Sequence, residues 1–151
     1  PYLVRSDGIG MEDSQLICRY LDQLDGNPQF HLPFEHGGWE YGRLETMARS
    51  FTDGVSVWVR EMRRPASERS PTILAHEHGR SRRIADRFDA EIGAPLLSAK
   101  PNMATLLLLV GLDFARDNGM DDHEASRPAL AAWAARARAR PSAVATRPPA
   151  S

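Results

Sequence analysis

Cysteine and long apolar runs are both scarce in this chain of 151 residues, which contains a single cysteine, Cys18. One cysteine excludes an internal disulfide framework and a zinc site built from several thiolates. The longest strongly apolar run, Leu106 to Val110, is far shorter than the roughly 20 residues that a membrane-spanning helix requires. No basic stretch followed by an apolar segment opens the chain. We therefore expect a cytoplasmic protein with no membrane partner.

The chain also lacks an excess of either charge. Nineteen basic side chains nearly balance twenty acidic ones, which argues against binding nucleic acid through a general electrostatic field. Arginines cluster at Arg80–Arg83 and at Arg136–Arg140. Acidic residues surround the first cluster, and the second falls at a predicted helix C-terminus, where cations are favoured. We expect both clusters to form solvated surfaces.

The first residues predict a β-hairpin. Pro1–Arg5 is short, apolar and compatible with a strand, Asp7-Gly8 is a strong tight-turn pair, and Ile9–Glu12 forms the returning strand. An isolated two-stranded hairpin is marginally stable in water. The hairpin therefore requires a neighbouring helix or further strands.

Helical periodicity dominates the rest of the chain. A first helix begins at Asp13-Ser14 and ends at Gly26-Asn27-Pro28, and residues 28–38 form a predicted linker without a clear period. Four longer helices follow, over about Trp39–Arg64, Pro71–Ile92, Asn102–Asn118 and Pro128–Arg140. The second of these is expected to turn five apolar side chains inward: Ile73, Ile84, Ala85, Phe88 and Ile92. The Pro/Ala-rich tail from Ser142 is predicted to be irregular.

Asp13 and Ser14 are the best candidates for ligand binding. A helix N-terminus has unpaired N–H groups and a partial positive charge, so it suits a carboxylate, to which the Ser14 hydroxyl can add a donor. The Asp13 carboxylate can hold an ammonium group. Both residues equally fit a simple helix cap, and their spacing alone leaves the two interpretations open.

The remaining reactive side chains carry weaker signals. Cys18 lies more than a turn into its predicted helix with no histidine nearby in sequence, so we expect a packing residue and not a nucleophile. His76 and His78 fall on opposite sides of a helix, whereas a zincin pair is spaced by four residues. We expect no metal. Three further histidines stand alone in predicted loops and are expected to be solvated: His31, His36 and His123.

Stretches along nearly the whole chain together resemble one known family. The Pro-Tyr-Leu-Val opening, the hairpin turn and the Glu-Asp-Ser-Gln-Leu-Ile-Cys-Arg-Tyr-Leu-Asp run from Glu12 are similar to the second half of a thioredoxin-like glutathione-binding domain. Ala48 to Gly54, the Gly-Leu-Asp-Phe-Ala-Arg run from Gly111 and the Arg-Pro-Ala-Leu-Ala-Ala-Trp run from Arg127 resemble the helical domain of bacterial glutathione S-transferases.

This resemblance implies an α+β fold. Residues 1–27 would form the C-terminal part of a thioredoxin-like domain, residues 28–38 a linker, and residues 39–151 an all-α C-terminal domain. Pro1 would match the cis-proline before the third strand of the family. The resemblance thus implies a chain truncated within its first domain, with the catalytic residue upstream of Pro1, and we expect the chain as printed to be inactive.

The resemblance also implies a function for the intact protein. Asp13, Ser14 and Pro1 would bind glutathione, the cosubstrate, and the enzyme would conjugate its thiolate to a small apolar electrophile. Such proteins are usually homodimers, without a metal. Two alternatives remain: a glutathione-dependent isomerase, dehalogenase or reductase of the same fold, and a non-catalytic binding or regulatory protein.

One position departs from the family pattern. The buried helix of the family begins with Ser or Thr and has Asp three residues later, whereas this chain has Asn102 and Thr105. Asn102 is a competent cap, but we expect Thr105 not to supply the reciprocal acceptor of a capping box. On that basis, Thr105→Asp is expected to stabilise the helix by roughly 0.5–1 kcal/mol.

Overall fold

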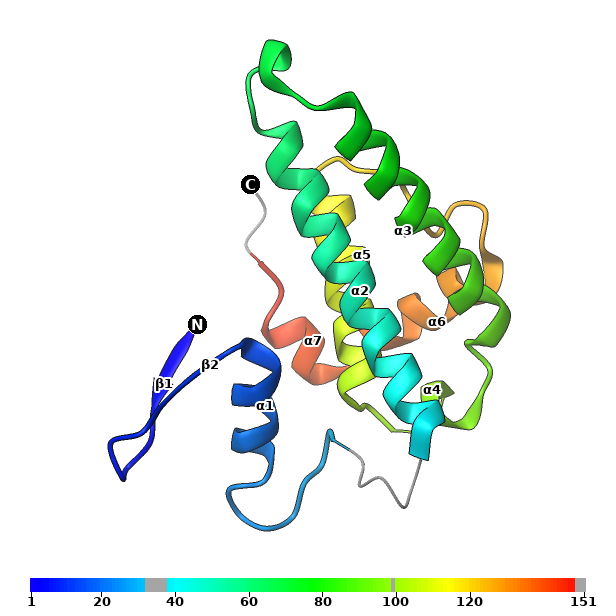
Figure 1. Cartoon of the computed structure of the whole chain (residues 1–151). Helices are drawn as coiled ribbons and strands as arrows, with labels where there is room; N and C mark the ends of the chain where they lie inside the picture. The colour runs from blue at the N-terminus through cyan, green and yellow to red at the C-terminus, as the bar shows by residue number, and fades with distance from the viewer. Residues whose placement is uncertain (32–37, 99, 149–151) are drawn as a thin grey trace.

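The computed structural model describes residues 1–31, 38–98 and 100–148, and within them a small hairpin part adjoins a larger helical body (Figure 1). The hairpin consists of β1 (Tyr2–Val4) and β2 (Gly10–Glu12), which pair antiparallel with Tyr2 opposite Glu12. Gly8 takes a φ of +83° in the connecting turn, a backbone conformation that glycine adopts without steric cost. The predicted hairpin is confirmed.

Helix α1 (Ser14–Asp22) follows the hairpin and ends earlier than predicted. The Asp22 carboxylate ends it, because its oxygens accept the backbone N–H groups of Gln29, Phe30 and His31 at 2.7–3.2 Å. The chain is thereby folded back below α1. Burial raises the pKa of Asp22, but these N–H groups and the His31 ring outweigh it and lower the pKa to about 2.

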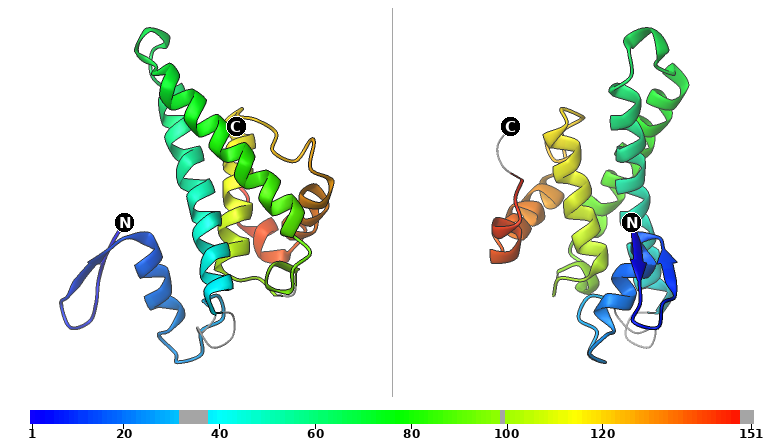
Figure 2. Two further views of the ribbon diagram at one scale, coloured as in Figure 1. Left: turned by 45° about the vertical axis from the view of Figure 1, so that its right-hand side comes forward. Right: turned by 90° about the vertical axis from the view of Figure 1, so that its left-hand side faces the viewer.

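Three long helices build the core of the helical body: α2 (Gly38–Met62), α3 (Pro71–Glu91) and α5 (Met103–Asp117). Helix α2 packs against both α3 and α5, and the hairpin and α1 project from one side of this body (Figure 2). Shorter elements complete it: the 3-10 turn η2 (Ala66–Glu68), α4 (Pro95–Ser98), α6 (Pro128–Arg138) and α7 (Pro141–Ala145). None of the helices within the described ranges is long and apolar enough to cross a membrane.

Helices α2 and α5 pack closely against each other at Gly111. A Cβ at that position would lie 2.7 Å from both the Phe51 ring and the Thr52 hydroxyl, so only glycine fits. The Thr52 hydroxyl donates to the Leu107 carbonyl across the same contact at 2.9 Å. Around it, large side chains are fully buried, including Phe51, Val55, Phe88, Leu108 and Leu130.

Two expectations about the helices are wrong. Ile73 is 39% exposed, because it lies in the first turn of α3, beyond the part of that helix that packs into the core. The tail is not irregular at Ser142, since α7 begins at Pro141 and continues to Ala145. Proline is favoured in a first helical turn because it has no N–H to lose there, so Pro141 ends one helix and starts the next.

The start of α5 also differs from expectation. The Asn102 side chain accepts the Thr105 N–H at 3.1 Å, and the Thr105 hydroxyl oxygen accepts the Asn102 N–H at 2.9 Å. Thr105 therefore completes a capping box, because a hydroxyl oxygen can accept as well as donate. Thr105→Asp was expected to stabilise the helix by adding an acceptor for the Asn102 N–H. Because Thr105 already accepts from that N–H, there is no longer a reason to expect the stabilisation.

Two of the three loop histidines are buried and not solvated. His31 is 2% exposed, and its Nδ1 lies 3.0 Å from Asp22. His123 is also 2% exposed and packs edge-on against Phe51, with 5.1 Å between the ring centroids. His36 lies outside the described residues.

Candidate functional site

The turn between β2 and α1 brings Asp13 and Ser14 to an exposed helix N-terminus. Asp13 is the N-cap, and its Oδ1 accepts the backbone N–H groups of Gln15 at 2.8 Å and Leu16 at 3.3 Å. Its φ of 73° lies in the left-handed region, where a side chain costs about 1–3 kcal/mol. The cap and the contacts of its second oxygen hold Asp13 in that conformation.

Ser14 is the first residue of α1 and is exposed. Among the described residues its hydroxyl has no hydrogen-bond partner. A free hydroxyl beside a helix N-terminus is suited to a carboxylate or another small anion. Asp13 therefore caps the helix, and the Ser14 hydroxyl takes no part in the cap.

Pro1 lies at the same end of the hairpin as these two residues. The register pairs Tyr2 with Glu12, so the antiparallel strands place Pro1 across from Asp13. Pro1 is exposed at the start of the chain. All three residues predicted to bind glutathione are therefore neighbours.

The sequence did not point to Arg49 of α2, which reaches the same turn. Its Nη2 donates to Asp13 Oδ2 at 2.7 Å, and its Nη1 donates to the Gln15 side-chain oxygen. The hydrogen bond from Arg49, followed by those from the Leu16 and Gln15 amides, lowers the pKa of Asp13 below its ordinary value. Arg49 is 36 positions from Asp13, and no local pattern links them. The only signal is a cation on the polar face of a long helix.

A second residue of α2, Glu45, also contacts α1. It is 3% exposed and accepts the Gln15 side-chain N–H at 3.0 Å, and its other oxygen lies 3.7 Å from Arg19. Because Arg49 and Glu45 are one helical turn apart, one face of α2 orients the first two turns of α1 through charged contacts. The candidate site is therefore built by both parts of the molecule.

Cys18 lies on the exposed surface of α1 and is not a packing residue, contrary to expectation. It lines an open depression at the other end of α1, together with Leu21, Leu24 and Phe30. That depression and the Asp13-Ser14 turn are separate. Across the described ranges, no three His, Cys, Asp or Glu side chains are grouped in a way that could hold a metal.

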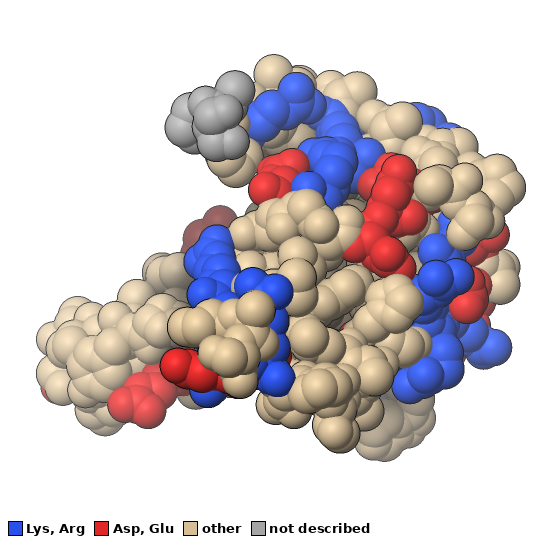
Figure 3. All heavy atoms as spheres, turned by 90° about the horizontal axis from the view of Figure 1, so that it is seen from above, with Lys and Arg blue, Asp and Glu red and all other residues tan. Residues whose placement is uncertain are grey.

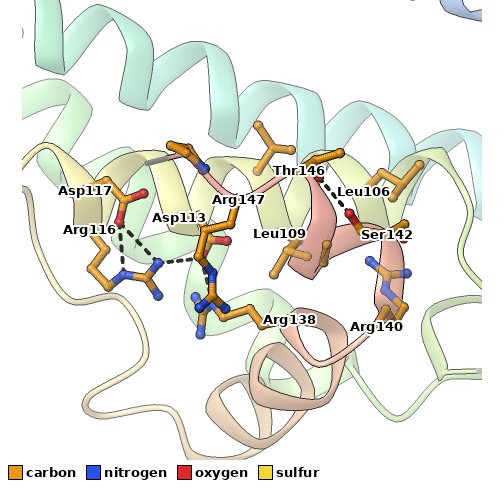
Figure 4. A pocket seen from close by; sticks show the side chains of 13 residues that line it. Leu106, Leu109, Asp113, Arg116, Asp117, Arg138, Arg140, Ser142, Thr146 and Arg147 are labelled. Carbon is orange, nitrogen blue, oxygen red and sulfur yellow. Dashed lines mark hydrogen bonds and ion pairs between the residues drawn. The ribbon is translucent and has the colours of Figure 1, made fainter. Parts of the chain in front are cut away.

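The surface also contains a pocket of about 340 Å³ between α5 and α7 (Figure 4). Leu106, Leu109, Val110 and Ala143 form its apolar side. Seen from above, the surface is notched between the projecting hairpin part and the C-terminal end, where acidic and basic side chains gather (Figure 3). The pocket lies between α5 and α7, whereas the Asp13-Ser14 turn contacts α2.

Charged side chains at the edge of this pocket are mostly paired with one another. Arg138 donates to Asp113 at 2.7 Å and binds both oxygens of Glu124, and it is only 16% exposed. Arg116 pairs with Asp113 and Asp117 at 3.1 and 3.2 Å. The second arginine cluster is thus not simply a solvated surface, because its central member, on α6, forms ion pairs with α5 and with the segment between these two helices.

Comparison with known proteins gives structural matches only. No family model matches the chain, and no curated protein sequence matches it significantly. A crystal structure of a glutathione transferase family member from Pseudomonas fluorescens with bound glutathione is similar, with a TM-score of 0.87 and 27% identity over 99% of this chain and 74% of that one. Another, from the same organism with bound S-(propanoic acid)-glutathione, has a TM-score of 0.86 and 27% identity over 99% and 77%.

A third similar structure comes from a more distant protein. It is a glutathione S-transferase from Methylobacterium radiotolerans in complex with glutathione sulfonate, with a TM-score of 0.81 and 21% identity. The match covers all of this chain and 73% of that one. At this identity the likeness concerns the fold: a small thioredoxin-like part followed by a helical domain.

Proposed function

The chain has the fold of the glutathione transferases, and from this premise we propose that it binds glutathione and that the protein transfers the glutathione thiolate to small electrophiles. The observation that carries the proposal is the pairing at the start of α1. A free serine hydroxyl at a helix N-terminus adjoins a carboxylate that is half exposed. These are complementary to the zwitterionic end of a γ-glutamyl group.

Each residue of the turn has a separate role in this proposal. The Ser14 hydroxyl and its backbone N–H bind the α-carboxylate of the γ-glutamyl group, assisted by the positive end of the α1 dipole. The Asp13 carboxylate binds the α-ammonium group through Oδ2, since Oδ1 is occupied by two backbone N–H groups. Pro1 borders the peptide backbone of glutathione.

The reaction in the proposal is a nucleophilic displacement or addition. The glutathione sulfur forms a bond to an electrophilic carbon, and the electron pair leaves with the displaced group or moves onto the acceptor, which then takes a proton. Asp13, Ser14 and Pro1 contribute by fixing one reactant in place, which removes the entropic cost of bringing two molecules together. None of the three is proposed to activate the thiol.

The similar structures support this choice of ligand, since one contains glutathione and another contains a glutathione conjugate. A glutathione-dependent isomerase, dehalogenase or reductase would use the same binding turn. Consumption of thiol with a generic electrophile such as a chloronitrobenzene distinguishes a transferase from a non-catalytic binding protein.

The binding site is tested on the chain itself. We expect that titrating glutathione into the isotope-labelled chain shifts the NMR signals of the Ser14 and Gln15 amides more than those of other residues. Ser14→Ala should weaken binding about tenfold, the usual effect of losing one hydrogen bond to a charged group. Ser67→Ala, an exposed serine in η2, is the matched control and should bind as the unmodified chain does. Unchanged affinity in Ser14→Ala contradicts the proposed site.

We also propose that the protein is a homodimer. Several apolar side chains stay exposed on the helical body, among them Val110 and Val144, each at 57%. Contact with a second copy would bury such residues. Light scattering on the eluting protein measures the mass directly, and the mass of a single chain at all concentrations would contradict the dimer.

A further inference from the structure

The Arg49 side chain of α2 forms hydrogen bonds with both the N-cap of α1, Asp13, and the residue after Ser14, Gln15. Its guanidinium group donates to the Asp13 carboxylate and the Gln15 side-chain oxygen, and its Nε lies 3.6 Å from Asp53. The group is 32% exposed, so these contacts are formed at the edge of the molecule and not in its core. A planar guanidinium can hold three acceptors at once in a fixed geometry.

We propose that Arg49 is a positioning residue for glutathione: from the helical domain, it fixes the orientation and charge of the Asp13 carboxylate that receives the α-ammonium group. This inference rests on the function proposed above. It assigns to α2 a part in recognition of the γ-glutamyl group, although Arg49 is not proposed to touch the ligand.

The two carboxylate oxygens of Asp13 show how the orientation is set. Oδ1 faces inward to the N–H groups of Gln15 and Leu16, and Oδ2 faces outward to Arg49. Rotation of the carboxylate would break contacts at both oxygens together. A carboxylate oxygen accepts more than one hydrogen bond, and the side chain is 50% exposed, so Oδ2 retains a position for an ammonium group.

The charges around the turn determine the proton state of Asp13. Arg49 of α2 is paired with Asp13, and Asp53 of α2 is paired with Arg49. The next ion pair between the two helices joins Glu45 of α2 to Arg19 of α1. Arg49 is the group in contact, and its hydrogen bond is the largest cause of the lowered pKa of Asp13. Without Arg49 that pKa rises toward its ordinary value, so Asp13 is protonated at a higher pH and loses its attraction for a cation.

A second cation beside Arg49 is compatible with this arrangement. The ligand ammonium and the guanidinium repel one another, but at an exposed site the effective dielectric constant is high and the repulsion is small compared with two direct hydrogen bonds to Oδ2. Asp53, paired with Arg49 on its outer side, offsets part of the positive charge. The network thus presents one available anionic oxygen to the ligand.

The experiment compares two ligands on four proteins. The ligands are glutathione and its analogue without the α-amino group, in which glutaryl replaces γ-glutamyl. The proteins are the unmodified chain, Arg49→Gln, Arg49→Lys, and the control Arg60→Gln, which removes an exposed arginine about three turns further along α2. Dissociation constants are measured between about pH 3 and pH 7, with circular dichroism at each pH to verify that the chain is folded.

The unmodified chain should bind glutathione about tenfold more tightly than the analogue. Arg49→Gln should reduce glutathione affinity about tenfold, leave analogue affinity within about twofold, and move the acid limb of glutathione binding to higher pH. Arg49→Lys keeps the charge and should recover part of the loss, and Arg60→Gln should bind as the unmodified chain does.

The outcomes separate this inference from the proposed function. If the unmodified chain binds neither ligand, or binds both equally, the proposed γ-glutamyl site itself is wrong. If the unmodified chain prefers glutathione to the analogue, and Arg49→Gln shows the same preference and the same loss of glutathione binding at low pH, Arg49 has no positioning role. An equal loss for both ligands in folded Arg49→Gln also overturns the inference, because it indicates a merely structural effect on the turn.

Discussion

The titratable ring of His123 is buried, and neither of its nitrogens has a hydrogen-bond partner within the described residues. Burial lowers the pKa of His123 below its ordinary value of 6.5, and the charges of Arg127 and His78 act in the same direction, against Asp121. The unfolded chain therefore takes up a proton at a higher pH than the folded one. His123 contributes stability that is complete above about pH 6.5 and is lost as the pH falls below it.

Replacing His123 should therefore flatten the dependence of stability on pH. We expect the free energy of unfolding of the unmodified chain to fall between pH 7 and pH 5 by up to about 1.4 kcal/mol per pH unit from this residue. His123→Leu should remove that part of the slope. Urea unfolding at several pH values measures it, with His76→Gln as the control, since His76 is 62% exposed on α3. Equal slopes for His123→Leu and the unmodified chain would contradict the assignment.

For helices, the contact at Gly111 allows a matched comparison of two glycines. Alanine is favoured over glycine inside a helix by about 1 kcal/mol, so a substitution without steric conflict should stabilise the chain. At Gly111 the new methyl group would press on the Phe51 ring and the Thr52 hydroxyl at 2.7 Å. Overpacking of that kind typically costs about 1–3 kcal/mol and forces α2 and α5 apart.

We accordingly expect opposite signs for two Gly→Ala substitutions. Gly111→Ala should lower the free energy of unfolding by about 1–2 kcal/mol, the overpacking cost reduced by the gain in helix propensity. Gly42→Ala, on α2 with no atom within 4 Å of the added Cβ, should raise it by up to about 1 kcal/mol. Denaturant midpoints measure both. Stabilisation by Gly111→Ala would show that the helices separate without cost.

Helix positions were largely predictable from sequence because each depends on neighbours a few residues apart. Pro71 starts α3 and Pro141 ends the preceding helix, as expected. Ser142 was misassigned, because a proline that ends one helix can open another. The hydroxyl of Thr105 was misjudged for a similar reason: residue type shows that it can accept, but only geometry shows that it does.

At the scale of the whole molecule, the sequence predicted only the part of the candidate site that a single turn forms. Asp13 and Ser14 adjoin each other, and the signal for a helix N-terminus is local. Arg49 reaches them only through the packing of α1 on α2, and His123 is buried against Phe51 and Trp58 of α2, far away in sequence. Periodicity places a residue on a face of its own helix and does not say what that face meets.

The contact between the hairpin part and the helical body is mainly polar, and this determines how the molecule opens. In α1 only Ile17 is a buried apolar residue, whereas Leu16 and Leu21 are about half exposed at 50% and 48%. The strands leave Tyr2 and Val4 exposed at 65% and 62%. Since local opening follows the apolar area that a segment buries, residues 1–22 should open without the rest.

Amide hydrogen exchange measures this directly. We expect amides of β1, β2 and α1 to exchange at least about 100-fold faster than those of α2 and α5, which hold the main core. Ile17→Ala should accelerate exchange in residues 1–22 further and leave α2 unchanged, because that side chain is the main apolar contact of α1. Leu16→Ala is the control. If Ile17→Ala accelerates exchange equally in α2 and α5, the two parts open as one cooperative unit, and the polar contacts through Arg49 and Glu45 bind them more tightly than their exposure indicates.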